Sequence, residues 1–353
     1  MPITVLSVAY PLAGVSPSTA GGAEQVLLTL DQALVRLGHR SLVLAAAGSK
    51  CHGLLVPVQV PSGVLDDRAR REAQQQFQRA LDWTLQRYRV DVVHMHGLDF
   101  DRYLPHGEVP AVVSLHLPLE WYRPAALRPN RPHTSLICVS HSQARTASPD
   151  VQIAGIIPNG VDLESFQPKH RLGDYALVLA RICPEKGIDL AIEAASKAGV
   201  RLVLGGTLYE YPEHRQYFDS AVKPRLNHSA RFIGAVGGKR KSQLLAGARC
   251  LLVPSLARET GSLIAMEAMA CGTPVIAWRS GALPEIVCHG RTGFLVASVK
   301  EMAEAIANAA SIHRNECRRE AERRFSAERM ISQYLDLYRE VQAQNPATEL
   351  QAA

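Results

Sequence analysis

Short apolar runs alternate with helical segments along the first half of the chain. Residues 3–10, 41–45 and 90–95 form apolar runs of the kind that buried strands contain. Between them, residues 24–37 are amphipathic at helical spacing and residues 67–88 predict a more polar helix. Strands that alternate with helices in this way predict a doubly wound α/β domain with a mostly parallel sheet.

The alternation pauses once and then restarts. Apolar runs at 111–115 and 136–140 extend the first set, and residues 157–160 (IPNG) predict a strand end that enters a turn. A helix at 185–197 belongs to the second set. The strands of that set are predicted at 175–180, 201–204, 231–233, 251–254, 274–277 and 293–296.

We therefore predict two Rossmann-like domains, one at 1–160 and one at 174–326. The polar segment 161–173, which contains Pro168, is the predicted linker. Residues 300–340 predict consecutive helices, and we expect the last of these, at about 327–345, to pack back onto the first domain.

Composition agrees with two packed domains and indicates a cytoplasmic chain. A length of 353 residues with 47% hydrophobic residues is enough for a large core. The seven cysteines include no CxxC pair and no metal-ligand spacing, which favours reduced thiols. The first apolar run is too short for a secretion signal or a membrane span, so we expect a cytoplasmic protein.

The net charge of +6 and the isoelectric point near 9.0 leave three interpretations open. The charge could be solvated surface, a field that attracts anionic ligands, or a surface that contacts acidic lipid or nucleic acid. No basic block is interleaved with aromatic residues, so nucleic acid is disfavoured. A phosphate-bearing substrate and weak peripheral contact with the inner face of a membrane both stay open.

The segment 258–273 (RETGSLIAMEAMACGT) carries the clearest chemical signal. A predicted strand ends at Pro254 and leads through a polar turn into a helix that stops near Gly272. Glu259 would precede this helix and Glu267 would lie about one turn inside it. The free amides of residues 261–263 would then lie between two carboxylates, so diphosphate could bind the amides while the carboxylates accept hydrogen bonds from hydroxyls. A plain helix with surface glutamates is the alternative.

A second turn places two cations five residues apart at the carboxyl end of a predicted strand. Arg181 and Lys186 lie in this turn, at the sheet edge where α/β folds bind ligands. A guanidinium fork and an ammonium point charge together suit a diphosphate leaving group. An exposed basic turn without a ligand is the alternative.

Candidate groups in the first domain are a glycine pair and several histidines. Gly21 and Gly22 lie at the start of a helix, where free amides could meet an anion, although an ordinary turn has the same pattern. His116, at the carboxyl end of a strand, is the catalytic candidate. His94 and His96 would face one side of a strand, but no neighbouring Cys, Asp or Glu completes a metal shell, so we predict no metal site.

Several of these segments together resemble glycosyltransferase family 4. The shared motifs, in the family's order, are GGAE at 21–24, IPNGVD at 157–162, LARICPEKGIDLAIEA at 179–194, Glu259 and Glu267 with seven residues between them, AMACGTPVIAW at 268–278 and GALPEIV at 281–287. The resemblance covers nearly the whole chain. It implies the GT-B fold, in which two Rossmann-like domains face each other across a cleft that holds the active site.

The resemblance also implies roles for the candidate residues. Arg181 and Lys186 would neutralise the donor diphosphate, Glu259 would contact the transferred sugar and Glu267 would hold the ribose hydroxyls. The remaining donor contacts would come from Gly21, Gly22, Gly261, Ser262, Leu263 and Val236. His116 would be the active-site histidine of a retaining enzyme that needs no metal or other cofactor.

The chain departs from the family at two places that bear on the donor. Ser262 stands where many members have glycine, and residues 237–241 (GGKRK) are basic where acidic residues often follow. The family pattern therefore leaves the donor sugar and the base open, with a UDP-sugar favoured and a GDP-sugar as the alternative.

The acceptor is not defined by the sequence. Residues 117–133 form the candidate acceptor loop, in which Trp121 and Tyr122 could stack on a sugar ring and Arg123 could meet an anionic group. A saccharide, a lipid-linked acceptor and a small molecule all stay open. A nucleotide-sugar 2-epimerase of the same fold, or an inactive nucleotide-binding relative, is the alternative to a transferase.

Overall fold

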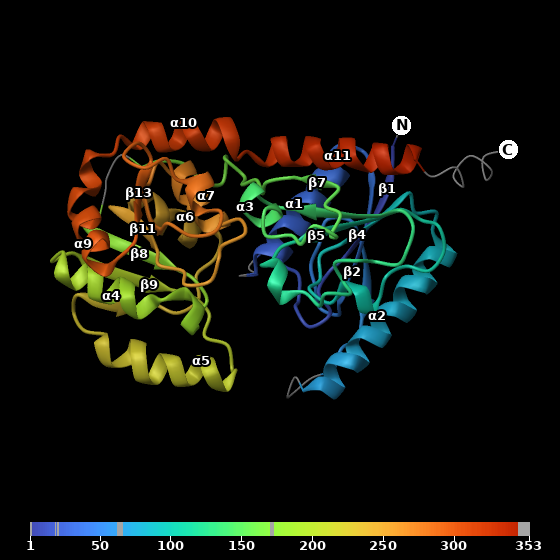
Figure 1. Cartoon of the computed structure of the whole chain (residues 1–353), viewed down its shortest axis with the longest axis horizontal. Helices are drawn as coiled ribbons and strands as arrows, with labels where there is room; N and C mark the ends of the chain where they lie inside the picture. The colour runs from blue at the N-terminus through green and yellow to red at the C-terminus, as the bar shows by residue number, and fades with distance from the viewer. Residues whose placement is uncertain (1, 18, 20, 62–65, 170–172, 345–353) are drawn as a thin grey trace. The chain divides into compact units, whose positions relative to one another are not determined.

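The computed structural model describes residues 2–17, 19, 21–61, 66–169 and 173–344. The chain forms two compact units (Figure 1), unit 1 with Met1–Pro158 and Met330–Ala353, and unit 2 with Asn159–Arg329. Each unit contains one sheet in which every strand pair is parallel. The predicted fold of two Rossmann-like α/β domains, with the C-terminal helix returning to the first, is confirmed.

Unit 1 contains a seven-stranded sheet of order β3-β2-β1-β4-β5-β6-β7. Its strands are β1 (Thr4–Val8), β2 (Arg40–Ala46), β3 (Leu54–Val58), β4 (Val92–Met95), β5 (Ala111–Leu115), β6 (Thr134–Cys138) and β7 (Gly155–Ile156). Its helices are α1 (Gly22–Arg36), α2 (Asp67–Arg87), α3 (His141–Ala144) and most of α11 (Ala327–Ala343). The edge strand β3 was not predicted.

The two faces of this sheet are covered by different helices. Alternate residues of β1 point to opposite faces, so Leu6 and Val8 pack with Phe77 and Leu81 of α2. On the other face, Leu27 of α1 packs against β2. Both cores therefore combine strand residues with the apolar faces of α1 and α2.

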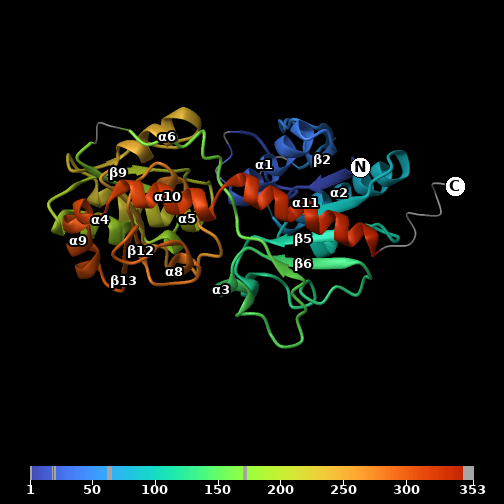
Figure 2. The ribbon, with the colours of Figure 1, turned by 90° about the horizontal axis from the view of Figure 1, so that it is seen from above.

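Figure 2 shows α11 running over the sheet of unit 1. Buried polar side chains attach this helix to β4 and β5. His94 lies between two hydroxyls, with Nδ1 2.7 Å from the Tyr338 hydroxyl and Nε2 2.8 Å from the Ser114 hydroxyl. The Ser114 hydroxyl also lies 2.6 Å from that of Tyr334. Each such bond contributes about 1 kcal/mol net, and removing one partner costs about 1–3 kcal/mol because the other stays buried.

Unit 2 repeats the design with a six-stranded sheet of order β10-β9-β8-β11-β12-β13. Its strands are β8 (Tyr175–Leu179), β9 (Arg201–Gly205), β10 (Ala230–Phe232), β11 (Cys250–Val253), β12 (Val275–Trp278) and β13 (Gly293–Val296). Its helices are α4 (Ile188–Lys197), α5 (Pro212–Tyr217), α6 (Gly238–Gly247), α7 (Leu263–Ala270), α8 (Leu283–Ile286), α9 (Val299–Ala307) and α10 (Arg314–Arg324). Helices α4 and α9 cover one face, and α6, α7 and α10 the other.

Two predicted segments differ from the structure. The helix expected at 185–197 begins at Ile188, because Pro184–Lys186 form a separate 3-10 turn that ends at Gly187 in the left-handed conformation. In the segment predicted as a linker, Val161 pairs with Ser326, and the Gly173 amide donates to the Gly247 carbonyl. These residues therefore belong to unit 2, whereas 170–172 lie outside the described residues.

The order of strands in unit 2 positions the candidate site. Strand β8 lies between β9 and β11, so the chain leaves β8 and β11 toward opposite sides of the sheet. The turns after these two strands therefore flank the topological switch point, where open α/β sheets bind ligands. These turns carry Arg181, Lys186 and Glu259.

Among the described residues, no helix has both the length and the apolar character that crossing a membrane requires.

Candidate active site

The turn after β8 is held tightly against the turn after β11. Gly187 has φ +56°, and a Cβ atom there would lie 2.4 Å from the Pro254 carbonyl oxygen. The Glu185 carbonyl accepts from the Leu256 amide at 2.8 Å and from the Ser255 hydroxyl at 3.3 Å. The turns after β8 and β11 are thus held together through backbone groups, and only glycine fits at position 187.

Lys186 and Glu259 form an ion pair across these turns. The Lys186 ammonium donates to Glu259 Oε1 at 2.5 Å, and both side chains are largely buried. Burial alone would raise the pKa of Glu259, but the charge and hydrogen bond of Lys186, together with the charge of Arg181, lower it. Glu259 is therefore ionised at neutral pH and can accept hydrogen bonds from hydroxyls.

The backbone of Glu259 is held by a glycine that precedes α8. Gly281 has φ +57°, and a Cβ atom there would lie 2.3 Å from the Glu259 carbonyl oxygen. That carbonyl accepts from the Ala282 amide at 2.7 Å. The GAL part of the GALPEIV motif thus positions a carboxylate of the site.

The predicted anion-binding residues lie at the start of α7. Ser262 is the N-cap residue of this helix, and its side chain makes no capping hydrogen bond. Leu263 begins the helix, and the Gly261 carbonyl accepts from the side-chain amide of Asn159 at 3.3 Å. Asn159 had not been predicted as part of the site.

Glu267 lies inside α7 and is paired with a lysine from α6. The Lys241 ammonium donates to Glu267 Oε1 at 2.5 Å. Burial raises the pKa of Glu267 despite the opposing effect of Lys241. Its second oxygen, Oε2, is buried and accepts no hydrogen bond within the described residues, so one acceptor is left for a ligand hydroxyl.

Val236 lies in the loop between β10 and α6. A Cβ atom on Gly205, the last residue of β9, would lie 2.9 Å from a methyl group of Val236. The next residue, Gly206, donates its amide to the Gly234 carbonyl at 2.8 Å. The loop therefore lies next to the carboxyl end of β9, on the same sheet edge as Arg181.

In unit 1, His116 belongs to a row of imidazoles. Its Nε2 lies 3.0 Å from Nδ1 of His96, and the two rings are stacked with centroids 5.3 Å apart. The His96 ring also lies 4.0 Å from that of His94. Burial lowers the pKa of His116 to about 4 and those of His94 and His96 well below their usual range, so all three are neutral at pH 7.

The glycine pair opens α1, as the sequence predicts. Gly21 is the N-cap residue and Gly22 the first residue of the helix. A Cβ atom on Gly21 would lie 1.9 Å from a carboxylate oxygen of Glu24. Glycine at 21 thus makes room for a carboxylate at the helix start, where the helix dipole favours negative charge.

The candidate acceptor residues differ in availability. Trp121 is 43% exposed, whereas Tyr122 is 4% exposed and its hydroxyl accepts from the Leu117 amide. Tyr122 packs in the core against Phe100, so the suggestion that its ring stacks on an acceptor is wrong. Arg123 is exposed and pairs with Asp101 at 2.8 Å.

Two family models match the chain, one in each half. Residues 20–165 match "Glycosyltransferase Family 4" and residues 164–326 match "Glycosyl transferases group 1". The chain belongs to glycosyltransferase family 4, as the motifs indicated.

Known proteins similar to this chain carry related names. A D-inositol 3-phosphate glycosyltransferase of Saccharomonospora viridis is 35% identical over 238 residues, which are 59% of this chain and 54% of that protein. The chain thus spans about half, or less, of the curated relatives it matches.

Solved structures resemble the whole chain. A glycosyltransferase involved in Avilamycin A biosynthesis is 27% identical with a TM-score of 0.74, and 97% of this chain and 98% of that one are covered. The Anabaena protein HepE, solved in complex with UDP-glucose, has a TM-score of 0.75 at 19% identity, with 96% and 100% covered. The second likeness shows the GT-B fold alone.

Proposed function

We propose that this chain is a retaining, metal-independent glycosyltransferase that moves a hexosyl group from a nucleotide-diphosphate sugar to an acceptor hydroxyl. The observation that carries the proposal is the pair of joined turns at the switch point of unit 2. They place Arg181 and Lys186 beside an ionised Glu259, so that charge for a diphosphate and an acceptor for sugar hydroxyls occur together.

Each donor part has a proposed partner in unit 2. Arg181, Lys186 and the amides at the start of α7 bind the diphosphate, and Glu259 accepts hydrogen bonds from the transferred sugar. Glu267 accepts from a ribose hydroxyl through Oε2, the oxygen that Lys241 leaves open. Val236 lies against the base. We favour a UDP-sugar, in agreement with the UDP-glucose complex of HepE.

The rate enhancement in this scheme comes from charge stabilisation and positioning. As the bond between the sugar and the diphosphate breaks, negative charge grows on the departing phosphate, and the two cations stabilise it. The acceptor hydroxyl attacks from the side of the leaving group and gives its proton to a phosphate oxygen. No protein nucleophile is needed.

The properties of His116 support retention. Inversion requires a base that deprotonates the acceptor on the face opposite the leaving group. An imidazole with a pKa of about 4 is a weak base at neutral pH. We therefore assign to His116 a hydrogen bond to the transferred sugar instead of proton abstraction.

We expect transfer to preserve the anomeric configuration of the donor. UDP-α-D-glucose would be incubated with a panel of acceptors that includes D-inositol 3-phosphate, chosen because of the name of the Saccharomonospora relative. NMR of the fresh product should show an α-linkage. A β-linkage would overturn the mechanism and the role of His116, and acceptor-independent conversion of the sugar at carbon 2 would identify an epimerase.

We also expect full turnover in excess EDTA. The positive charge for the leaving group comes from Arg181 and Lys186, so no divalent ion is required for this purpose. Initial rates with and without chelator should agree. If turnover disappeared with EDTA and returned with magnesium or manganese, the role given to the two cations would be wrong.

A further inference from the structure

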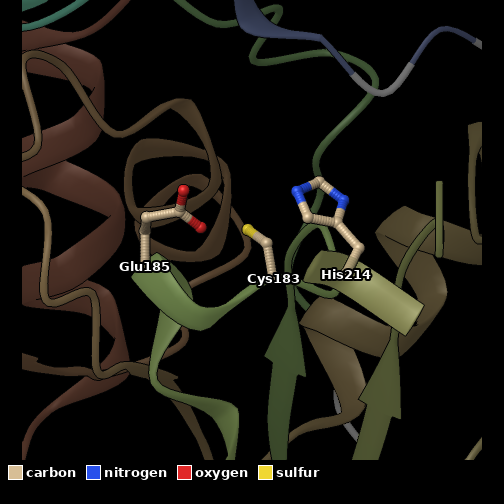
Figure 3. A group of neighbouring side chains, drawn as sticks. All are labelled: Cys183, Glu185 and His214. Atoms are coloured by element: carbon tan, nitrogen blue, oxygen red, sulfur yellow. The ribbon is translucent and has the colours of Figure 1, made fainter. Parts of the chain in front are cut away.

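Three side chains with metal-binding chemistry meet at the turn after β8. Cys183 and Glu185 come from the turn after β8, and His214 comes from α5. One ligand atom from each lies within 4.8 Å of the other two. Figure 3 shows the sulfur of Cys183 between the carboxylate of Glu185 and the imidazole of His214.

The three side chains of this cluster differ in how far they are exposed to solvent. Cys183 is fully buried, His214 is half-buried and Glu185 is exposed. Nδ1 of His214 is itself shielded from solvent and has no hydrogen-bond partner within the described residues. A buried polar atom without a partner calls for an explanation, and an ion beside it would provide one.

We propose that Cys183, Glu185 and His214 bind one divalent cation of the zinc class. A thiolate, an imidazole and a carboxylate are the ligands that zinc prefers, whereas magnesium and calcium prefer oxygen alone. A cation bonded at roughly 2.0–2.3 Å to each ligand would hold the three atoms about 3.5 Å apart, so modest rotations of Glu185 and His214 suffice. Three protein ligands leave the fourth position to water.

The neighbouring charges permit a cation here. Arg181 and Lys186 lie in the same turn, but Lys186 is already paired with Glu259. The thiolate and carboxylate bring two negative charges, which offset the charge of the metal. Without metal, the Cys183 thiol donates a hydrogen bond to the Arg181 carbonyl at 3.7 Å. Metal binding replaces that bond, and the thiol proton leaves to water.

The bound cation would tie two segments of unit 2 together. Cys183 and Glu185 lie between the two phosphate-binding cations in sequence, and His214 belongs to a short helix that follows β9. A metal shared between them would hold the turn to α5. The site supplies no ligand to the donor and is separate from the transfer reaction proposed above.

Cobalt substitution tests the site directly. The untagged full-length protein would be stripped with chelator and titrated with Co²⁺, whose bond to a thiolate gives a charge-transfer band in the near ultraviolet. We expect one equivalent of Co²⁺ to develop the band and one equivalent of Zn²⁺ to abolish it, whereas Mg²⁺ should leave it unchanged. Absence of the band in the folded wild-type protein would overturn the proposal.

Matched variants assign the ligands. Cys183→Ser should remove the band and Cys51→Ser, at a half-buried cysteine in unit 1, should keep it. His214→Gln should weaken Co²⁺ binding by at least about tenfold, whereas His228→Gln, at an exposed position, should not. If Cys183→Ser does not fold, the Co²⁺ affinity of His214→Gln tests the proposal by itself. A band that survives Cys183→Ser, or unchanged affinity in His214→Gln, would place the metal elsewhere.

Discussion

Replacing either cation of the turn after β8 should reduce turnover by roughly a hundredfold or more. Arg181→Ala and Lys186→Ala each remove a charge that we expect to stabilise the departing diphosphate. Within the described residues no carboxylate forms an ion pair with Arg181, so its loss affects mainly the ligand. Loss of Lys186 also leaves Glu259 without its ion-pair partner. Initial rates with saturating donor, measured with thermal unfolding, would show both effects.

A lysine on a nearby helix provides the control. The side chain of Lys197 in α4 is 54% exposed and pairs with Glu193 one turn away, so Lys197→Ala should leave both rate and stability nearly unchanged. If Arg181→Ala and Lys186→Ala folded normally and kept near wild-type rates, the two turns could not be the donor-phosphate site.

Neutralising the two carboxylates of the candidate site, Glu259 and Glu267, should impair different steps of the reaction. Glu259→Gln should reduce transfer far more than it reduces affinity for the free nucleoside diphosphate, because we place Glu259 against the sugar. Glu267→Gln should weaken nucleotide binding itself, since the ribose would lose a charged acceptor whose hydrogen bonds are worth about 1.5–3 kcal/mol, or roughly tenfold to a hundredfold in affinity. Calorimetry with UDP and steady-state rates would separate the two.

Glu304 of α9 is an exposed glutamate of the same unit, and Glu304→Gln should change neither quantity. Equal losses of UDP affinity in Glu259→Gln and Glu267→Gln would mean that the donor lies in the opposite orientation along α7.

Most strands of both sheets could be predicted from the sequence, because buried parallel strands appear in it as apolar runs. Elements without a clear apolar pattern were missed. Strand β3 contains Pro57 and alternates in exposure, and α6 begins with Gly238 and three basic residues before its first apolar position at Leu244. Helix α5 is short and largely exposed. Such elements form because tertiary contacts hold them, which local pattern does not report.

The site was predictable to the same extent. Glu259 and Glu267 follow from their spacing around a helix start, and Arg181 and Lys186 from their place at a strand end. Lys241 could be noted only as part of a basic segment, because its contact with Glu267 depends on how α6 packs against α7. His214 is joined to Cys183 in the same non-local way.

The polar attachment of α11 bears on how the chain matures on the ribosome. Unit 1 is discontinuous, and Tyr334 and Tyr338 are synthesised after all of unit 2. During translation, His94 and Ser114 are therefore made before the hydroxyl groups of Tyr338 and Tyr334, with which they later form hydrogen bonds. The whole sequence of unit 2 is synthesised before the last segment of unit 1. Unit 2 can therefore complete its native contacts before unit 1 does, although synthesis of unit 1 begins first.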